Sequence, residues 1–202
     1  KKNKGSVILY FYSINLLPLL YEIEEKKYYE IYGYNLHSWP NYIVWNEDHK
    51  NWLKSHVMGN RNYLKANYIP FAGEYKDLEN KKKTIVIFDV PPKRPEIYYQ
   101  LNNPYNIYTL KYCQKFISDI LNSIDENLIQ QVDLIIKLKR DFYNIDTNYQ
   151  SFLNKLIENK KLKVLKNIAP ESAINIADAT ISIPFTSPAI YSYSKGIDTI
   201  YY

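Results

Sequence analysis

Hydroxyl and cationic side chains follow two apolar runs in the second half of this 202-residue chain. The segment "SIPFTSPAIYSYSKG" places Ser182, Thr186 and Ser187 between an apolar run and a stretch with helical character. The segment "KLKRD" puts cations at the end of another apolar run, namely Lys137, Lys139 and Arg140. The N–H groups at the start of a helix favour an anion, and hydroxyls and cations nearby add to that preference. These residue types therefore predict a phosphate-binding site, provided that the fold brings them together.

A simpler interpretation of the Ser187 turn needs no ligand. Ser187 stands directly before Pro188, and this order is typical of a helix N-cap followed by proline at the first helical position. We therefore expect Ser187 to cap a helix. Its place at a turn from strand to helix favours a bound anion in addition, because ligands of parallel sheets gather at such turns.

The elements that must position these residues alternate from residue 83 onward. Apolar β-branched runs and helical periodicity predict strands at 84–90, 132–139, 162–167, 179–184 and 198–202, and helices at 108–124, 148–160, 170–178 and 188–195. Alternation with short connections is typical of a parallel sheet. We expect an α/β fold, with a Rossmann-like parallel sheet that carries helices on both faces. The candidate residues would then share the carboxyl edge of that sheet.

The first 80 residues have a different character. We expect a buried strand at 7–12 followed by a loop or helix, a second strand at 41–45, a helix at 47–54 and a loop-rich segment from 57 to 83. A boundary near residue 80 divides the chain into segments 1–80 and 81–202. The sequence begins without methionine and ends within an expected strand, so we expect a piece of a longer protein.

Five further residues are weaker candidates for chemistry. Asp89 follows a strand, where it could act as a base or orient a sugar hydroxyl, although aspartate often caps the next turn. Pro170, Glu171 and Ser172 lie in an expected first helical turn; they could reach a ribose or base, but proline, acids and hydroxyls are favoured there on helical grounds alone. His37 is the one histidine that we would test as an acid or base.

Composition excludes several classes of site. The histidines His37, His49 and His56 match no metal-ligand spacing, and we expect no metal and no cofactor. Cys113 is the single cysteine, which excludes an internal disulfide and is typical of a reducing compartment. The apolar stretch near the N-terminus is too short and too interrupted to span a bilayer. A net charge of +5 and 22 tyrosines do not by themselves indicate nucleic-acid binding.

Several segments resemble the polysaccharide-biosynthesis proteins named for a PFTS motif. They are "VWNEDHKNWL", "VMGN", "IVIFDVPP", "IIKLKRD" and "ISIPFTSPAIYSYSKGIDTIYY", and the motif itself is Pro184-Phe185-Thr186-Ser187. More distantly the chain is similar to bacterial glycosyltransferases with two Rossmann-like domains, the GT-B type, including sialyltransferase-like and capsule enzymes. The resemblance implies that 1–80 is the tail of an acceptor-side domain, and that 81–202 is a nucleotide-sugar-binding domain cut short at its C-terminus.

The function implied by this resemblance is sugar transfer in O-antigen or capsule biosynthesis. The implied enzyme needs no metal; a nucleotide-sugar would be its donor and a glycan or lipid-linked molecule its acceptor. Its place would be cytoplasmic, compatible with peripheral association with the inner membrane. In this interpretation Lys137, Lys139, Arg140, Ser182, Thr186 and Ser187 contact the donor phosphates, and this chain alone binds nucleotide without turnover. The alternatives are a GT-B-type sugar-nucleotide epimerase, a polyol-phosphate transferase, or a non-catalytic binding module for polysaccharide assembly.

Overall fold

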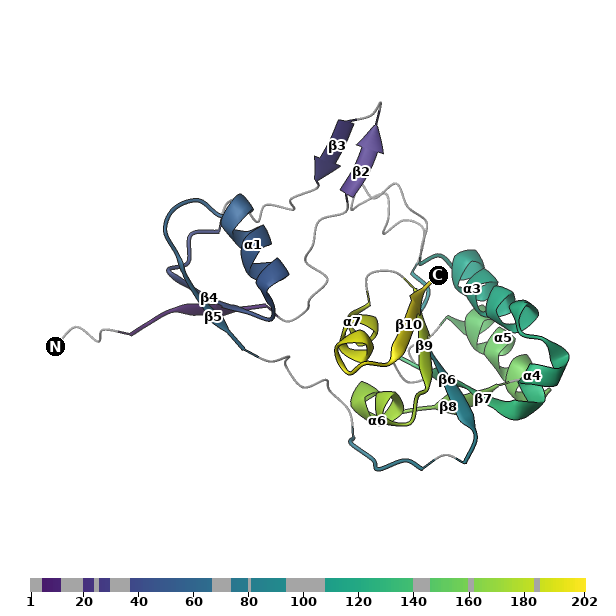
Figure 1. Ribbon diagram of the computed structural model, residues 1–202. Helices are drawn as coiled ribbons and strands as arrows, with labels where there is room; N and C mark the ends of the chain where they lie inside the picture. Colours follow the sequence, from purple (N-terminus) through teal and green to yellow (C-terminus); the bar gives the residue numbers. More distant parts are fainter. Residues whose placement is uncertain are drawn as a thin grey trace. The chain divides into compact units, whose positions relative to one another are not determined.

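The chain divides into two compact units, residues 1–70 and 71–202, each described by itself (Figure 1). The computed structural model describes residues 5–11, 20–23, 26–29, 37–66, 74–79, 81–93, 108–139, 146–159, 162–183 and 186–202. The sequence predicts a boundary near residue 80, whereas residues 74–79 pack within the second unit. The backbone carbonyl of Glu74 accepts a hydrogen bond from the amide of Ala169 at 2.8 Å.

A five-stranded parallel sheet forms the centre of the second unit. Its strands are β6 (Lys83–Phe88), β7 (Val132–Lys137), β8 (Lys163–Leu165), β9 (Ala179–Ser182) and β10 (Asp198–Tyr201). They lie in the order β10-β9-β6-β7-β8, so the chain moves outward from β6 to β8 and then crosses back to β9. This reversal makes the carboxyl ends of β6 and β9 a topological switch point, where ligands bind in such sheets.

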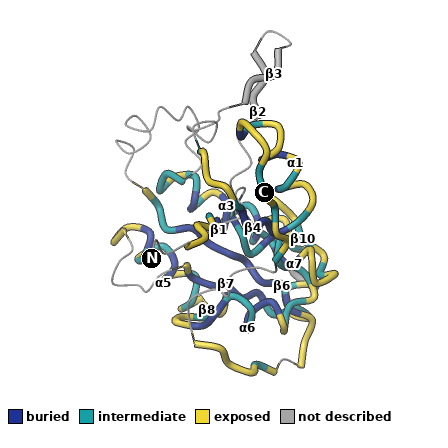
Figure 2. The backbone as a smooth tube through the Cα atoms, turned by 90° about the vertical axis from the view of Figure 1, so that its left-hand side faces the viewer, coloured by how far each residue is buried: buried dark blue, intermediate teal, exposed yellow. Residues whose placement is uncertain are grey.

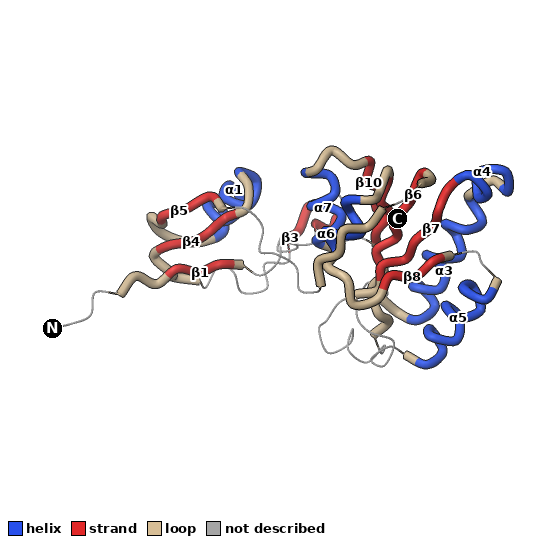
Figure 3. The backbone as a smooth tube through the Cα atoms, turned by 90° about the horizontal axis from the view of Figure 1, so that it is seen from below, coloured by secondary structure: helices blue, strands red, loops and turns tan. Residues whose placement is uncertain are grey.

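Helices cover both faces of this sheet (Figure 3). They are α3 (Leu110–Ser123), α4 (Glu126–Gln131), α5 (Thr147–Glu158), α6 (Pro170–Asn175) and α7 (Ser187–Ser194). The predicted α/β, Rossmann-like fold with helices on both faces is therefore confirmed. Helix α4 was not predicted; its start is fixed by the Asp125 side chain, which accepts a hydrogen bond from the Asn127 amide at 2.7 Å.

Each face of the sheet has its own apolar core. On one face Ile87 and Ile136 pack with Phe116 of α3 and Leu153 of α5. On the other face Val86, Phe88 and Ile135 pack with Ala173 and Ile174 of α6. Figure 2 shows β6 and β7 in the colour of buried residues. These two strands are buried on both sides, which agrees with their near-continuous apolar sequence.

The first unit holds a second, smaller parallel sheet. Its strands are β1 (Ile8–Tyr10), β4 (Asn41–Val44) and β5 (Asn62–Lys65), in the order β1-β4-β5. Helix α1 (Glu47–His56) connects β4 to β5. Its Trp52 and Leu53 pack against Tyr42 and Val44 on one face of the sheet. Asn46 caps α1 by accepting a hydrogen bond from the His49 amide at 2.8 Å.

Two expectations for the first segment are wrong, and a third missed one strand. The strand at β1 is not buried, because Ile8 and Tyr10 are 45% and 37% exposed. Where a loop or helix was expected, β2 (Leu20–Ile23) and β3 (Lys26–Tyr29) pair as an antiparallel hairpin. The segment predicted to be loop-rich contains β5, which pairs with β4 in parallel register. The sequence of β5, "NYLK", has little apolar character, so its pairing with β4 determines that it forms a strand.

The start of α7 differs from the expectation that Ser187 is its N-cap. Thr186 occupies the N-cap position, Ser187 is the first helical residue, and no side chain caps the helix in the described part of the chain. The Thr186 hydroxyl instead donates to the carbonyl oxygen of Ile183 at 3.0 Å, within the preceding turn. The predicted serine cap is therefore wrong, and the hydroxyl of Thr186 closes the turn between β9 and α7.

The end of α7 requires glycine. Gly196 follows the helix with φ of +77°, in the left-handed region that other residues adopt at a cost. Replacing Gly196 with alanine should lower the free energy of unfolding by about 1 kcal/mol. That cost is purely conformational, because a Cβ at this position would meet nothing within 4 Å. Urea unfolding should show a smaller loss for Gly196→Asn, since asparagine tolerates this conformation; an equal or larger loss for asparagine would contradict the assignment.

A buried histidine makes the first unit sensitive to acid. The His49 ring lies edge-on to Phe11 with centroids 4.9 Å apart, and its Nδ1 accepts from the Trp45 amide at 3.5 Å. Burial lowers the pKa of His49 from 6.5 to about 4. Between pH 6.5 and 4 the unfolded chain therefore binds a proton at His49 that the folded unit does not bind. The contribution of His49 to the free energy of unfolding is complete above pH 6.5 and is lost as pH falls towards 4.

This sensitivity can be read by tryptophan fluorescence, because all three tryptophans, Trp39, Trp45 and Trp52, lie in the first unit. The urea concentration at the midpoint of the fluorescence change should be lower at pH 5 than at pH 7. The His49→Gln variant should lose most of this pH dependence, whereas His56→Gln should keep it. A midpoint that is the same at both pH values in the parent chain would contradict the role assigned to His49.

Candidate functional site

The carboxyl ends of β6, β7 and β9 lie along one edge of the second unit's sheet. The register pairs Phe88 of β6 with Lys137 of β7 on one side and with Ser182 of β9 on the other. Residues paired in this way point to the same face of a sheet. Phe88 packs on the face covered by α6, so Lys137 and Ser182 point to that face too. The structure thus brings two predicted site residues from separate segments to the switch point.

Ser182 is the most unusual side chain at this edge. It is fully buried, and its Oγ has no hydrogen-bond partner among the described residues. A buried hydroxyl without a partner costs free energy, so such a group in a native structure calls for an explanation. Ser182 is the last residue of β9 and comes directly before the turn into α7. A ligand that binds at the carboxyl edge of the sheet would lie at this position.

The turn into α7 presents the start of a helix to the same edge. Thr186 is buried and Ser187 is half-buried. Because no side chain caps α7 in the described part, the N–H groups of its first turn can still bind an anion. Tyr201 supports this turn from β10, since its hydroxyl donates to the carbonyl oxygen of Thr186 at 3.4 Å. Sequence reasoning missed Tyr201, because only the pairing of β10 with β9 brings it near the turn.

The two lysines at the carboxyl end of β7 occupy different environments. The strand ends at Lys137, which is buried and whose Nζ donates to the carbonyl oxygen of Leu138 at 2.5 Å. Lys139 lies beyond the strand and is exposed. The strand predicted at 132–139 therefore ends at Lys137 and does not include Lys139. Lys137 therefore places a buried cation at the edge of the sheet, whereas the charge of Lys139 lies at the surface. Arg140 lies outside the described residues.

Asp89 lies at the carboxyl end of β6 and connects it to the end of β7. Its Oδ1 accepts a hydrogen bond from the backbone amide of Lys139 at 2.8 Å, and its own amide donates to the carbonyl oxygen of Lys137 at 3.3 Å. Asp89 is only 4% exposed. These contacts fix the loop that carries the two lysines, so the geometry fits a positioning residue better than a base that meets substrate.

Burial perturbs the groups around this carboxyl. Desolvation raises the pKa of Asp89 from 3.8 to about 7, against the opposing effects of the Lys139 amide and the Lys137 charge. Desolvation also raises the pKa of the Cys113 thiol to about 12 and raises that of the Tyr149 hydroxyl further, with the Asp89 charge as a second cause in both. The Tyr149 hydroxyl acts in the opposite direction and lowers the pKa of Asp89. Neither this hydroxyl nor Asp89 Oδ2 forms a hydrogen bond of standard geometry with a described residue. Perturbed groups of this kind are typical of functional sites.

The start of α6 is occupied largely by structural contacts. Pro170 is its first residue, as predicted, and Glu171 lies half-buried in the first turn. Ser172 is fully buried, and its hydroxyl accepts a hydrogen bond from the backbone amide of Lys76 at 2.8 Å. Ser172 therefore anchors the segment 74–79, and Glu171 is the more accessible candidate for a ribose or base.

The last sequence candidate, His37, lies in the first unit. It is half-buried, and its ring is stacked on Phe11 with centroids 6.4 Å apart. Among the residues that the structure describes, no three histidine, cysteine or acidic side chains gather as metal ligands would. No helix within the described ranges is long and apolar enough to cross a bilayer.

Comparison with known proteins gives one family. Residues 1–202 match the family described as "Polysaccharide biosynthesis PFTS motif protein". No curated protein and no solved structure matches the chain.

Proposed function

We propose that this chain, which belongs to the family of polysaccharide biosynthesis PFTS motif proteins, is a glycosyltransferase whose second unit binds a nucleotide-sugar donor. The family name implies a role in polysaccharide biosynthesis. The observation that carries the finer proposal is the uncapped start of α7 beside the buried Ser182 hydroxyl, at the switch point of a parallel sheet. The last two residues of the motif, Thr186 and Ser187, lie at that helix start.

The donor phosphates would bind at the first turn of α7. In the transfer step, the bond from the anomeric carbon to the phosphate oxygen breaks while an acceptor oxygen bonds to that carbon. The acceptor proton passes to a general base, and the nucleotide leaves with additional negative charge. The α7 amides, the Ser187 hydroxyl and the charges of Lys137 and Lys139 would stabilise that charge, as fixed dipoles and cations do in other enzymes. This arrangement supports a leaving-group role that needs no metal.

Other residues take supporting roles in this proposal. Asp89 holds the end of β7 through the Lys139 amide, and so positions the cationic loop. Glu171 would reach the ribose or base from the start of α6. Residues 1–70 would belong to the acceptor side, with a glycan or lipid-linked acceptor, and His37 is the candidate there for an acid or base. The proposed setting is the cytoplasm or the cytoplasmic face of the membrane.

Thermal unfolding with nucleotides tests the donor proposal. CMP, UDP, GDP and dTDP are each added to the chain, and we expect one nucleotide to raise the unfolding temperature, because a ligand of the folded state stabilises by mass action. The matching nucleotide-sugar is then incubated with the longest available form of the protein. Transferred sugar would support the proposal, whereas an epimerised sugar-nucleotide or a transferred polyol phosphate would replace it with another chemistry. No stabilisation by any of the four would contradict donor binding.

A further inference from the structure

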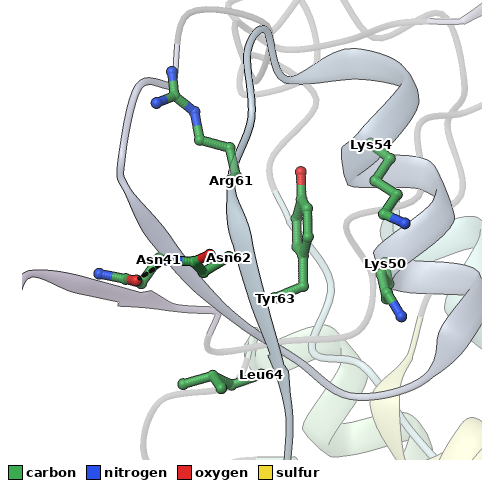
Figure 4. Close-up of a pocket in the computed structure, with 7 residues that line it drawn as sticks. All are labelled: Asn41, Lys50, Lys54, Arg61, Asn62, Tyr63 and Leu64. Atoms are coloured by element: carbon green, nitrogen blue, oxygen red, sulfur yellow. Dashed lines mark hydrogen bonds between the residues drawn. The ribbon is translucent and has the colours of Figure 1, made fainter.

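A groove of about 450 Å³ lies along the edge strand β5 in the first unit (Figure 4). It is lined by Asn41 of β4, by Lys50 and Lys54 of α1, and by Arg61, Asn62, Tyr63 and Leu64. Figure 4 shows the Tyr63 ring standing between Arg61 on one side and the two α1 lysines on the other. All lining residues belong to the first unit, so the groove is separate from the candidate donor site.

The groove is strongly cationic. Its lining includes three cations and no carboxylate. Lys50 and Lys54 are four residues apart on α1 and so share one helix face. Lys50 pairs with Glu47 at 3.1 Å, whereas within the described residues neither Lys54 nor Arg61 forms an ion pair. Like charges around a concave surface repel each other and focus a positive potential, which an anion would relieve.

Neutral donors complete the lining. The Tyr63 ring is stacked on Tyr42 with centroids 5.7 Å apart, which holds it in place. Asn62 Nδ2 donates to Asn41 Oδ1 at 3.0 Å, and Asn41 Nδ2 donates to the carbonyl oxygen of Val7 at 2.9 Å. Arg61 Nε is buried without a hydrogen-bond partner among the described residues. The groove is thus a set of aromatic and amide groups beside three cations, of which only Lys50 forms an ion pair among the described residues.

We propose that this groove binds a phosphate-bearing ligand, a phosphomonoester or a pyrophosphate, which Arg61 and the α1 lysines would hold from either side of the Tyr63 ring. Since Lys50 already pairs with Glu47, Lys54 and Arg61 are left to be neutralised. A single carboxylate would neutralise only one of these two charges, whereas a phosphate dianion matches both and a pyrophosphate can also draw on Lys50. The guanidinium of Arg61 can donate two parallel hydrogen bonds to phosphate oxygens, and the lysines add point charges. The organic part of the ligand would lie against Tyr63 and Leu64. This inference goes beyond the proposed donor site and does not depend on it.

Tryptophan fluorescence offers a specific readout, because all three tryptophans lie in the first unit and Trp52 belongs to the same helix, α1, as Lys50 and Lys54. Inorganic pyrophosphate titrated into the chain should change the fluorescence with saturation. The variants Arg61→Gln and Lys54→Gln should each weaken binding by roughly tenfold, as expected for loss of a charge-assisted contact. Lys65→Gln is the matched control, since it removes the same charge from β5 outside the groove and should leave the affinity within about twofold.

Two additional titrations define the ligand and its source. Glucuronate, a carboxylated sugar, should bind much more weakly than pyrophosphate; equal affinity would overturn the assignment to phosphate. Sedimentation with phosphatidylcholine vesicles, with and without phosphatidic acid, separates a lipid headgroup from a soluble phosphate. Co-sedimentation that needs phosphatidic acid and is lost in Arg61→Gln would assign the lipid, whereas binding of pyrophosphate alone would assign a soluble ligand.

The proposal fails if pyrophosphate leaves the fluorescence unchanged, or if Lys65→Gln weakens binding as much as Arg61→Gln does. Either result would mean that the groove has no phosphate site beyond the general positive charge of the chain. A change at Ser187 in the second unit should leave this titration unaffected. Failure here is therefore distinguishable from failure of the donor proposal.

Discussion

Replacing Ser187 with aspartate should weaken, by about tenfold or more, the binding of the nucleotide that raises the unfolding temperature, while leaving the second unit folded. Ser187 is the first residue of α7, and no described side chain caps that helix. A carboxylate there favours the helix, because it complements the positive end of the helix dipole. The same carboxylate repels a phosphate bound at the first turn. Calorimetric titration with the nucleotide and thermal unfolding of the free variant would measure both effects.

Asn127→Asp is the matched control for this variant. It adds the same charge to the first turn of α4, which leads into the amino end of β7, the opposite end of that strand from Lys137. This control should bind nucleotide like the parent chain. If Ser187→Asp also binds like the parent, the phosphates do not lie at α7, and the buried Ser182 hydroxyl needs another explanation.

Replacing Asp89 with asparagine should stabilise the second unit at pH 8 and remove most of its pH dependence between pH 4 and 8. Desolvation raises the pKa of Asp89 from 3.8 to about 7 in the folded chain. The folded state therefore binds more protons than the unfolded chain in this range, so stability falls as pH rises and the loss is complete above pH 7. A shift of this size corresponds to up to about 4 kcal/mol. Asparagine avoids the loss and can still accept the hydrogen bond from Lys139.

Urea unfolding followed by NMR signals of second-unit residues measures this effect at each pH. Asp178→Asn is the matched control, because the pKa of Asp178 is lowered by its hydrogen bond and charge pairing with Lys83 and by the Thr84 amide. The stabilisation by Asp178 is lost only as pH falls below 3.8, so its replacement should shift stability equally from pH 5 to 8. A parent chain with flat stability over that range would contradict the buried, perturbed state of Asp89.

The parallel sheet of the second unit could be predicted because its signals are local. The runs "IVIF" in β6 and "LII" in β7 are apolar over their whole length, which is typical of strands buried on both faces. β5 could not be predicted in this way. The sequence "NYLK" forms one of the three strands of the small sheet. It is a strand because it pairs with β4, and its own composition does not predict this. The β2–β3 hairpin was missed for the same reason.

The site could be predicted in outline but not in detail. Parallel order alone places Lys137, Ser182 and Ser187 at one edge, and this needed only the alternation of strands and helices. The roles of single residues depend on contacts that sequence does not contain. Serine before proline usually caps a helix, yet here the chain turns one residue earlier and Thr186 bonds back to Ile183. Local rules are most often violated at functional or strained sites, and the proposed donor site includes this turn.

The most direct test of the donor site is an NMR titration of the isotopically labelled chain with the nucleotide that stabilises it. We expect the largest amide shifts at 88–90, 137–139, 182–183 and 186–190, where the carboxyl ends of β6, β7 and β9 meet the start of α7. Smaller shifts are expected at 170–172, at the start of α6. Shifts confined to the first unit, or to the amino ends of these strands, would contradict the assignment of this edge as the nucleotide-sugar site.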